Sequence, residues 1–192
     1  MSQGNKKNKI AIIGHTRGIG KAIADLYQKK NYSIVGMSSS NGYDLQFSQV
    51  EIMEQIDDCR LIVINAYVGG GQMTLLKRIY GKYLFENKKV VVITSTSGTP
   101  IGADEELGNP EYRDYCKNKK ILIGYIEELQ QELFNKPLSI YDVCPDVVDT
   151  EMTKGLWEDL PKLTAGEVAE AVRYCFESTF NVNKIVIQKN AH

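Results

Sequence analysis

The sequence has little of what metal centres and disulfide frameworks require. Four cysteines and two histidines occur among its 192 residues. Cys59, Cys116, Cys144 and Cys175 are far apart in the chain, and no CxxC or mixed Cys/His ligand spacing occurs. We therefore expect no metal site and no disulfide. Reduced, mostly buried thiols in a cytoplasmic protein are the simpler interpretation.

Long apolar runs and an excess of one charge are also missing. No apolar run approaches the roughly 20 residues that a membrane-spanning helix needs. The net charge is −1, so no broad basic field favours nucleic acid or an anionic membrane as partner. The first residues, MSQGNKKNK, are polar and basic without a following apolar segment. We expect residues 1–8 to be a flexible tail rather than a signal peptide.

What the chain does have is a regular alternation of apolar runs and helix-period segments. Its length and composition suit one globular domain, residues 1–192. Strands are predicted at Ile10–Ile13, Tyr32–Met37, Leu61–Asn65, Val90–Ser95, Leu138–Cys144 and Ile185–Ile187. Helices are predicted at Gly18–Lys30, Gln49–Asp57, Met73–Phe85, Glu111–Phe134 and Ala165–Thr179. This order predicts an α/β fold with a doubly wound parallel sheet of the Rossmann type, which binds ligands at the carboxyl ends of its strands.

The stretch from Lys9 to Tyr27 combines a strand, a glycine turn and a helix. Gly14, Gly18 and Gly20 follow the first apolar run with the spacing GxxxGxG. Glycines allow close approach of backbone to a ligand, and a helix N-terminus offers free N–H groups. This corner therefore suits the pyrophosphate of a dinucleotide, although a tight turn without a ligand would have the same pattern.

Hydroxyls and a tyrosine–lysine pair follow further along the chain. Thr94 to Ser97 end a predicted central strand, where side chains are placed for ligand contact. Tyr115 and Lys119, four residues apart, share one face of the next helix. A plain Ser/Thr turn and an exposed helix with solvated lysines are the alternatives, since this tyrosine–lysine spacing is expected about once by chance.

These motifs, in this order from Lys9 to Ile187, resemble the short-chain dehydrogenase/reductase family. The resemblance implies a nicotinamide-dependent oxidoreductase that interconverts a small-molecule carbonyl and alcohol by hydride transfer. It implies catalytic roles for Ser95, with Ser97 as the fallback, and for Tyr115 and Lys119. The implied cofactor-binding residues are Gly14, Thr16, Arg17, Gly18, Ile19, Gly20, Ser38, Asp44, Leu45, Asn65, Ala66, Tyr115, Lys119, Pro145, Val148 and Thr150.

The region after the second strand bears on the choice of cofactor. An NAD site usually has an acidic residue there, and this chain has Ser38, Ser39 and Ser40 instead. Arg17 could pair with a 2′-phosphate, so we expect NADP, with NAD possible. Asp44 and Leu45 match the family's adenine contact, but the chain reaches them without the further helix and strand of longer members.

Other family elements are altered. Asn65-Ala66-Tyr67 resembles the Asn-Ala-Gly element, with Tyr67 in place of glycine. In Pro145–Thr150, Asp146 replaces the glycine of a Pro-Gly pattern, and the backbone at Val147 and Val148 is expected to meet the nicotinamide carboxamide. The family's catalytic Asn is missing, and Gln72 is a possible substitute. These departures leave open a dinucleotide-binding sensor or regulator without turnover.

The resemblance also predicts how the residues act. Tyr115 is the expected general acid in reduction, and the ammonium group of Lys119 is expected to lower its pKa from the usual ~10. The segments Thr99–Pro110 and Glu151–Leu160 are expected to set the substrate; Trp157 either lines that pocket or only packs. We also expect a homodimer or homotetramer formed through the helix Glu111–Phe134, as in related proteins. Thr164 and Glu167 predict a capping box.

Overall fold

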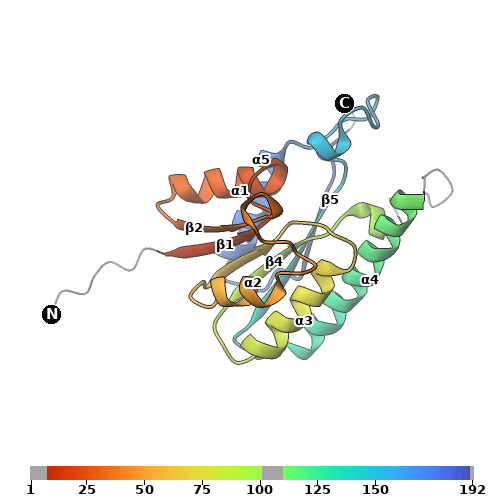
Figure 1. Cartoon of the computed structure of the whole chain (residues 1–192). Helices are drawn as coiled ribbons and strands as arrows, with labels where there is room; N and C mark the ends of the chain where they lie inside the picture. The colour runs from red at the N-terminus through yellow and green to blue at the C-terminus, as the bar shows by residue number, and fades with distance from the viewer. Residues whose placement is uncertain (1–7, 101–109, 191–192) are drawn as a thin grey trace.

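The computed structural model describes residues 8–100 and 110–190, and they form one parallel sheet with helices on both faces (Figure 1). The six strands lie in the order β2-β1-β3-β4-β5-β6. Their bounds are β1 Lys9–Ile13, β2 Ser33–Met37, β3 Leu61–Ile64, β4 Lys89–Ile93, β5 Ser139–Pro145 and β6 Lys184–Ile187. The predicted doubly wound fold is confirmed, and the switch in strand order falls between β1 and β3.

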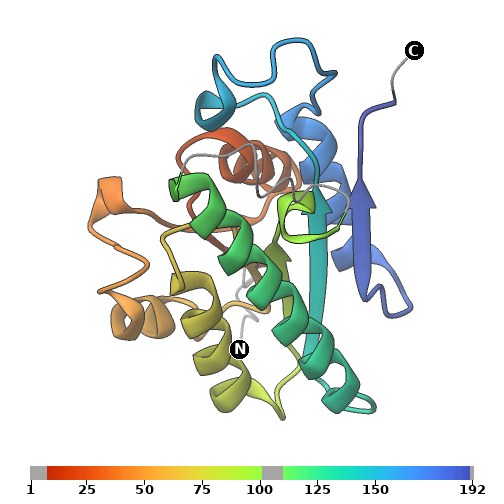
Figure 2. The same ribbon diagram turned by 90° about the vertical axis from the view of Figure 1, so that its right-hand side faces the viewer.

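Within residues 8–100 and 110–190, five helices cover the two faces of the sheet. They are α1 Gly18–Lys29, α2 Gln49–Gln55, α3 Gly71–Tyr83, α4 Pro110–Glu132 and α5 Ala165–Glu177. Helices α1 and α5 lie together on one face, and α2, α3 and α4 cover the other (Figures 1 and 2). Short 3₁₀ turns follow three strands, at Ser39–Asn41, Thr96–Gly98 and Glu151–Thr153.

The apolar runs are continuous because each central strand is buried on both faces. In β1, Ile10 and Ile12 pack toward α1 and α5, whereas Ala11 and Ile13 belong to the core under α2, α3 and α4. All four of these residues have at most 1% of their surface exposed. A parallel sheet covered on both faces therefore explains the lack of polar alternation.

The predicted elements agree with the structure to within one or two residues at most ends, and α3 begins at Gly71, two residues before the predicted Met73. The chain passes from β2 to β3 through only the turn at Ser39 and the short helix α2, so β2 is an edge strand. Residues 101–109 of the predicted substrate loop Thr99–Pro110 lie outside the described residues. Within residues 8–100 and 110–190, no helix is long and apolar enough to cross a bilayer.

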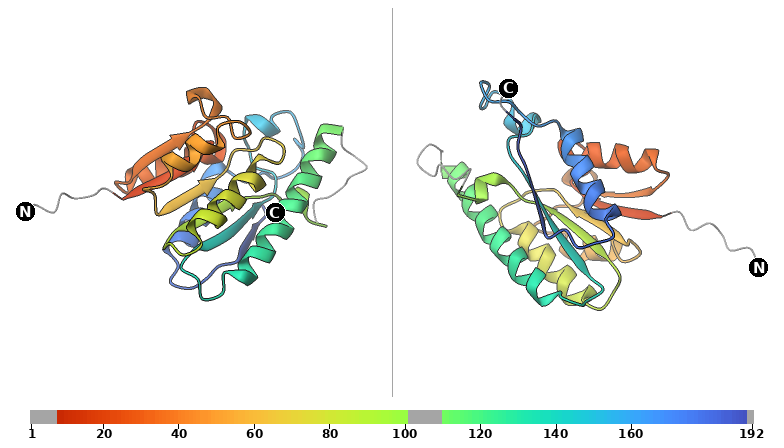
Figure 3. Two further views of the ribbon diagram at one scale, coloured as in Figure 1. Left: turned by 60° about the horizontal axis from the view of Figure 1, so that its bottom comes forward. Right: turned by 180° about the vertical axis from the view of Figure 1, so that it is seen from behind.

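The edge of the sheet that carries the carboxyl ends of the strands collects the candidate residues. The loop before α1, the loop before α3, the turn after β4 and the start of α4 converge there (Figure 3). Residues from distant parts of the chain thereby share one surface of the molecule.

Candidate functional site

The glycine loop between β1 and α1 is packed too tightly for side chains. Gly14 has φ +89°, and a Cβ there would lie 2.8 Å from the backbone nitrogen of Ala66. A Cβ on Gly20 would lie 1.9 Å from the Gly14 carbonyl oxygen. The Asn65 side chain donates a hydrogen bond to that same oxygen at 2.9 Å. Three of the predicted cofactor residues, Gly14, Asn65 and Ala66, are thus in direct contact.

The turn after β5 closes over the same loop. Gly18 has φ +52°, and a Cβ on it would lie 3.2 Å from a methyl group of Thr150. Val148 forms a parallel bridge with Leu163, in which the carbonyl of Val147 and the N–H of Asp149 are used. In that pattern the N–H of Val148 points away from Leu163. Gly18 and Thr150 are therefore in contact, and Val148 lies two residues before Thr150 in the same turn.

The polar turn after β2 is internally bonded. The Ser38 hydroxyl forms a hydrogen bond with the Ser40 hydroxyl and another with the side-chain oxygen of Asn41. Arg17 precedes α1, is exposed, and forms no ion pair within the described part of the chain. Arg17 is thus a cation without an ion-pair partner among the described residues, and the turn Ser38–Asn41 directly after β2 has no acidic side chain.

His15 is a residue of this region that the sequence motifs did not indicate. A Cβ on Gly36 would lie 2.3 Å from the His15 ring, so the ring covers that glycine of β2. Its Nδ1 is buried without a hydrogen-bond partner among the described residues. Only a glycine at position 36 leaves room for the His15 ring. A glycine inside the apolar strand β2 was therefore the one sign in the sequence that another group packs against this strand.

Asp44 and Leu45 have clear local roles. One carboxylate oxygen of Asp44 accepts hydrogen bonds from the N–H groups of Gln46, at 2.7 Å, and Phe47, at 3.2 Å. The Leu45 side chain is buried and fills the space beside Gly71. These contacts give Asp44 and Leu45 a structural role in the turn before α2. A contact of either residue with adenine stays a prediction.

Ser95, Tyr115 and Lys119 come together although they lie on two elements. Ser95 lies two residues after β4 and caps the following turn, where its oxygen accepts from the N–H of Ser97 at 3.2 Å. A Cβ on Gly98 would lie 2.7 Å from the Lys119 carbonyl carbon, so this glycine lets α4 approach the turn. Ser95 hydrogen-bonds to the Tyr115 phenol, and Lys119 Nζ lies 5.5 Å from the Tyr115 ring centre.

The protonation of this pair differs from the prediction. Burial raises the pKa of Tyr115 to about 12, although the hydrogen bond from Ser95 acts in the opposite direction. Burial lowers the pKa of Lys119 to about 7, against the opposing effect of the Asp142 carboxylate. The expectation that the ammonium group of Lys119 lowers the Tyr115 pKa was wrong for these contacts, because desolvation is the largest effect on both groups.

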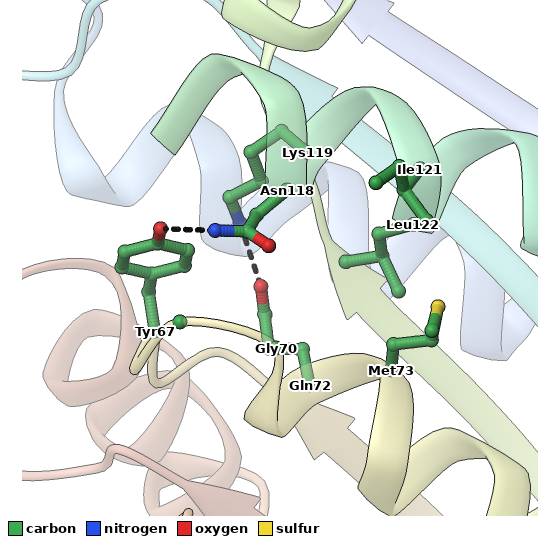
Figure 4. A pocket seen from close by; sticks show the side chains of 9 residues that line it. Tyr67, Gly70, Gln72, Met73, Asn118, Lys119, Ile121 and Leu122 are labelled. Atoms are coloured by element: carbon green, nitrogen blue, oxygen red, sulfur yellow. Dashed lines mark hydrogen bonds between the residues drawn. The ribbon is translucent and has the colours of Figure 1, made fainter. Parts of the chain in front are cut away.

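Gln72 is the main residue whose role the sequence did not define. Its side-chain oxygen accepts a hydrogen bond from Lys119 Nζ at 2.8 Å (Figure 4). Lys119 Nζ also donates to the Ile93 carbonyl at 2.9 Å. A cavity of about 70 Å³ between α3 and α4 reaches this pair, and Tyr67 and Asn118 line it too. The tyrosine hydroxyl accepts from Asn118 at 3.3 Å.

Aromatic rings extend from this pair toward the segment after β5. The Tyr67 ring lies edge-on to Tyr115, with centres 4.8 Å apart. On the other side, Tyr112 stacks on Tyr115, and Trp157 packs against Tyr112 at 5.7 Å. Trp157 is 40% exposed, so it does not pack in a core. Of the two alternatives, a position beside the site is the one the contacts support.

Among the described residues, no group of three or more His, Cys, Asp or Glu side chains is arranged to hold an ion. All four cysteines are buried and free.

Known proteins resemble this chain over most of its length. The 3-oxoacyl-[acyl-carrier-protein] reductase of Vibrio harveyi is 24% identical over 210 residues, which cover 85% of this chain and 83% of that protein. The enzyme of the same name from Haemophilus influenzae is 26% identical, with 86% of each chain covered. No family model matches the chain.

Solved structures share its fold. A short-chain dehydrogenase/reductase from Vibrio parahaemolyticus has a TM-score of 0.73 at 20% identity and covers 95% of this chain and 97% of its own. A short-chain dehydrogenase from Burkholderia cenocepacia, solved with NADP, has a TM-score of 0.78 at 14% identity, with 95% and 88% covered. The chain is thus similar in sequence to these reductases and shares the fold of short-chain dehydrogenases/reductases.

Proposed function

We propose that the protein is an NADP(H)-dependent oxidoreductase that interconverts a carbonyl and an alcohol on a small molecule. The observation that carries the proposal is the meeting of Ser95, Tyr115 and Lys119 at the carboxyl end of β4, beside the glycine loop. The sequence relatives are named as reductases. Among the structural neighbours, some were solved with NADPH or NADP and others with NADH.

The residues present fit a dinucleotide. Gly14, Gly18 and Gly20 leave backbone exposed in the loop where a pyrophosphate would lie at the N-terminus of α1. Asn65 braces that loop, and the N–H of Val148, which is not used in the bridge to Leu163, could donate to a carboxamide. The exposed Arg17 and the absence of an acid after β2 favour a 2′-phosphate, and hence NADP over NAD.

The chemistry then divides between the cofactor and the chain. When bound, the reduced nicotinamide supplies the hydride. Tyr115 donates the proton to the substrate oxygen, and a pKa of about 12 keeps the phenol protonated at neutral pH. The Ser95 hydroxyl, which already meets this phenol, donates a hydrogen bond to the same oxygen and stabilises its developing charge. Lys119 holds the hydroxyls of the nicotinamide ribose through the N–H groups of its side-chain nitrogen.

The experiment is NADPH consumption with a panel of aldehydes and ketones by wild type and Tyr115→Phe. We expect the variant to lose about 100- to 10,000-fold in kcat while it binds NADPH as wild type does. Tyr125→Phe, on the same helix but away from Ser95, is the control and should keep its activity. Equal turnover in wild type and Tyr115→Phe would sink the proposal, as would a wild type that binds NADPH but reduces nothing, which is the outcome expected for a sensor.

We further propose that the chain forms a homodimer or homotetramer through α4, in the cytoplasm. The long helix has Ile121 with 47% of its surface exposed, next to the cavity at Lys119. Free, buried cysteines are compatible with a reducing compartment.

A further inference from the structure

Gln72 is a buried polar side chain with a complete set of partners. It is the second residue of α3, and only 2% of its surface is exposed. Its amide nitrogen donates to the carbonyl oxygens of Ile64 and Ile93, each at 3.2 Å. Its oxygen accepts from Lys119 at 2.8 Å. The one side chain therefore joins the ends of β3 and β4 to the ammonium group.

We propose that Gln72 is a positioning residue that holds Lys119 directly against the ends of β3 and β4. The inference rests on the proposed function for its consequence, but the contact itself does not. Lysine has a flexible four-carbon stem, so its nitrogen needs fixed acceptors to keep one place. Gln72 and the Ile93 carbonyl supply two of them, and the ammonium group has three donors. One donor is thus left without a partner among the described residues.

The amide is suited to this position by its chemistry. It is both a double donor, which the two carbonyls need, and an acceptor, which the ammonium group needs. Asparagine is one methylene shorter and cannot span the same three partners. Methionine of similar length offers Lys119 no comparable acceptor and leaves the Ile64 carbonyl without its amide partner. Glutamate keeps an acceptor for Lys119 but loses both donors.

The other groups near Lys119 do not replace this contact. Asp142 and Cys144 face it from β5, and the rings of Tyr67 and Tyr115 lie 5.4 and 5.5 Å from Nζ. Asp142 already accepts from Thr94 and pairs with Lys184 at 3.5 Å. None of these groups forms a hydrogen bond to Lys119 within the described residues. The position of its nitrogen therefore depends on Gln72 and Ile93.

The test compares Gln72→Glu and Gln72→Met with wild type by NMR of labelled lysine side chains. The assignment of the Lys119 signal comes from Lys119→Met. A carboxylate at position 72 should raise the pKa of Lys119 by about 1 or more, whereas methionine should lower it because the charged form loses an acceptor. If both variants titrate like wild type, Gln72 does not position Lys119 and the proposal is overturned. This readout needs no substrate and stands even if the protein proves not to be a reductase.

Activity supplies the second readout. We expect Gln72→Met to lower kcat about 100-fold. Gln72→Glu should raise the Lys119 pKa and therefore move the pH profile of kcat to higher pH. The matched control is Gln49→Met. Gln49 is also a buried glutamine, 5% exposed, and its amide joins the carbonyls of Leu45 and Gly71. The Gln49→Met variant should lose about as much thermal stability as Gln72→Met but keep the pH profile of wild type. A profile that is unchanged in both Gln72 variants would contradict the proposal.

Discussion

At the scale of single residues, the choice of cofactor depends on one exposed cation. Arg17 lies at the edge of the glycine loop, free of ion pairs within the described residues, and the turn Ser38–Asn41 directly after β2 has no acidic side chain. A 2′-phosphate paired with it would gain a charge-assisted hydrogen bond. NADP preference should therefore follow this side chain.

Arg17→Ala should weaken NADPH binding about 10-fold or more and leave NADH binding unchanged, since only NADPH has the phosphate. Titration calorimetry with both nucleotides measures this. Lys29→Ala, at the far end of the same helix, is the control for lost positive charge. Equal losses for NADPH and NADH would mean that Arg17 does not contact the phosphate.

The buried ammonium group of Lys119 should also show in the stability of the fold. Its pKa is lowered from 10.5 to about 7, so between these values the unfolded chain binds a proton that the folded chain releases. Stability from this group therefore rises with pH, by at most about 1.4 kcal/mol per pH unit. Above about pH 9 the effect is opposed by Cys175, whose pKa burial raises to about 12.

Urea unfolding of wild type and Lys119→Met at pH 7 and 9 isolates the contribution, because all other groups are common to both proteins. The free energy of unfolding of the variant minus that of wild type should fall as the pH rises. A difference that is constant or grows would show that Lys119 keeps its ordinary pKa in the folded protein.

At the scale of elements, local rules in the sequence decided most boundaries. Thr164 and Glu167 form the predicted capping box at the start of α5, with the Thr164 N–H donating to the carboxylate at 2.7 Å. Thr164→Ala should cost about 1 kcal/mol in urea unfolding. Thr74→Ala, which removes only an exposed bond to Gly70 within α3, should change stability by less than about 0.5 kcal/mol. Similar losses in both variants would contradict a special role for the box.

The helices and strands could be predicted well from the sequence. Both faces of the sheet are covered, so its central strands are continuous apolar runs that are easy to recognise. It could not predict contacts that depend on three-dimensional packing. Gln72 and His15 acquire their partners only when α3 meets α4 and the glycine loop meets β2. The predicted direction of the Tyr115 pKa shift was wrong for the same reason. The spacing of Tyr115 and Lys119 predicts that they lie close together, but it does not predict how deeply either group is buried.

At the scale of the whole molecule, the exposed side of α4 is the surface we expect to pair with another copy. Ile121→Glu places a charge there and should convert an oligomer to a monomer in light scattering. Val50→Glu, at a 56% exposed valine of α2, should leave the assembly unchanged. A monomeric wild type would refute this interface.

One measurement tests the central claim most directly, which is a crystal structure of the protein with bound NADPH. We predict the pyrophosphate on the loop from Gly14 to Gly20, and the nicotinamide ring between Val148 and the hydroxyl of Tyr115, with Lys119 on its ribose. A dinucleotide bound at another surface, or a nicotinamide out of reach of the Tyr115 hydroxyl, would contradict the account.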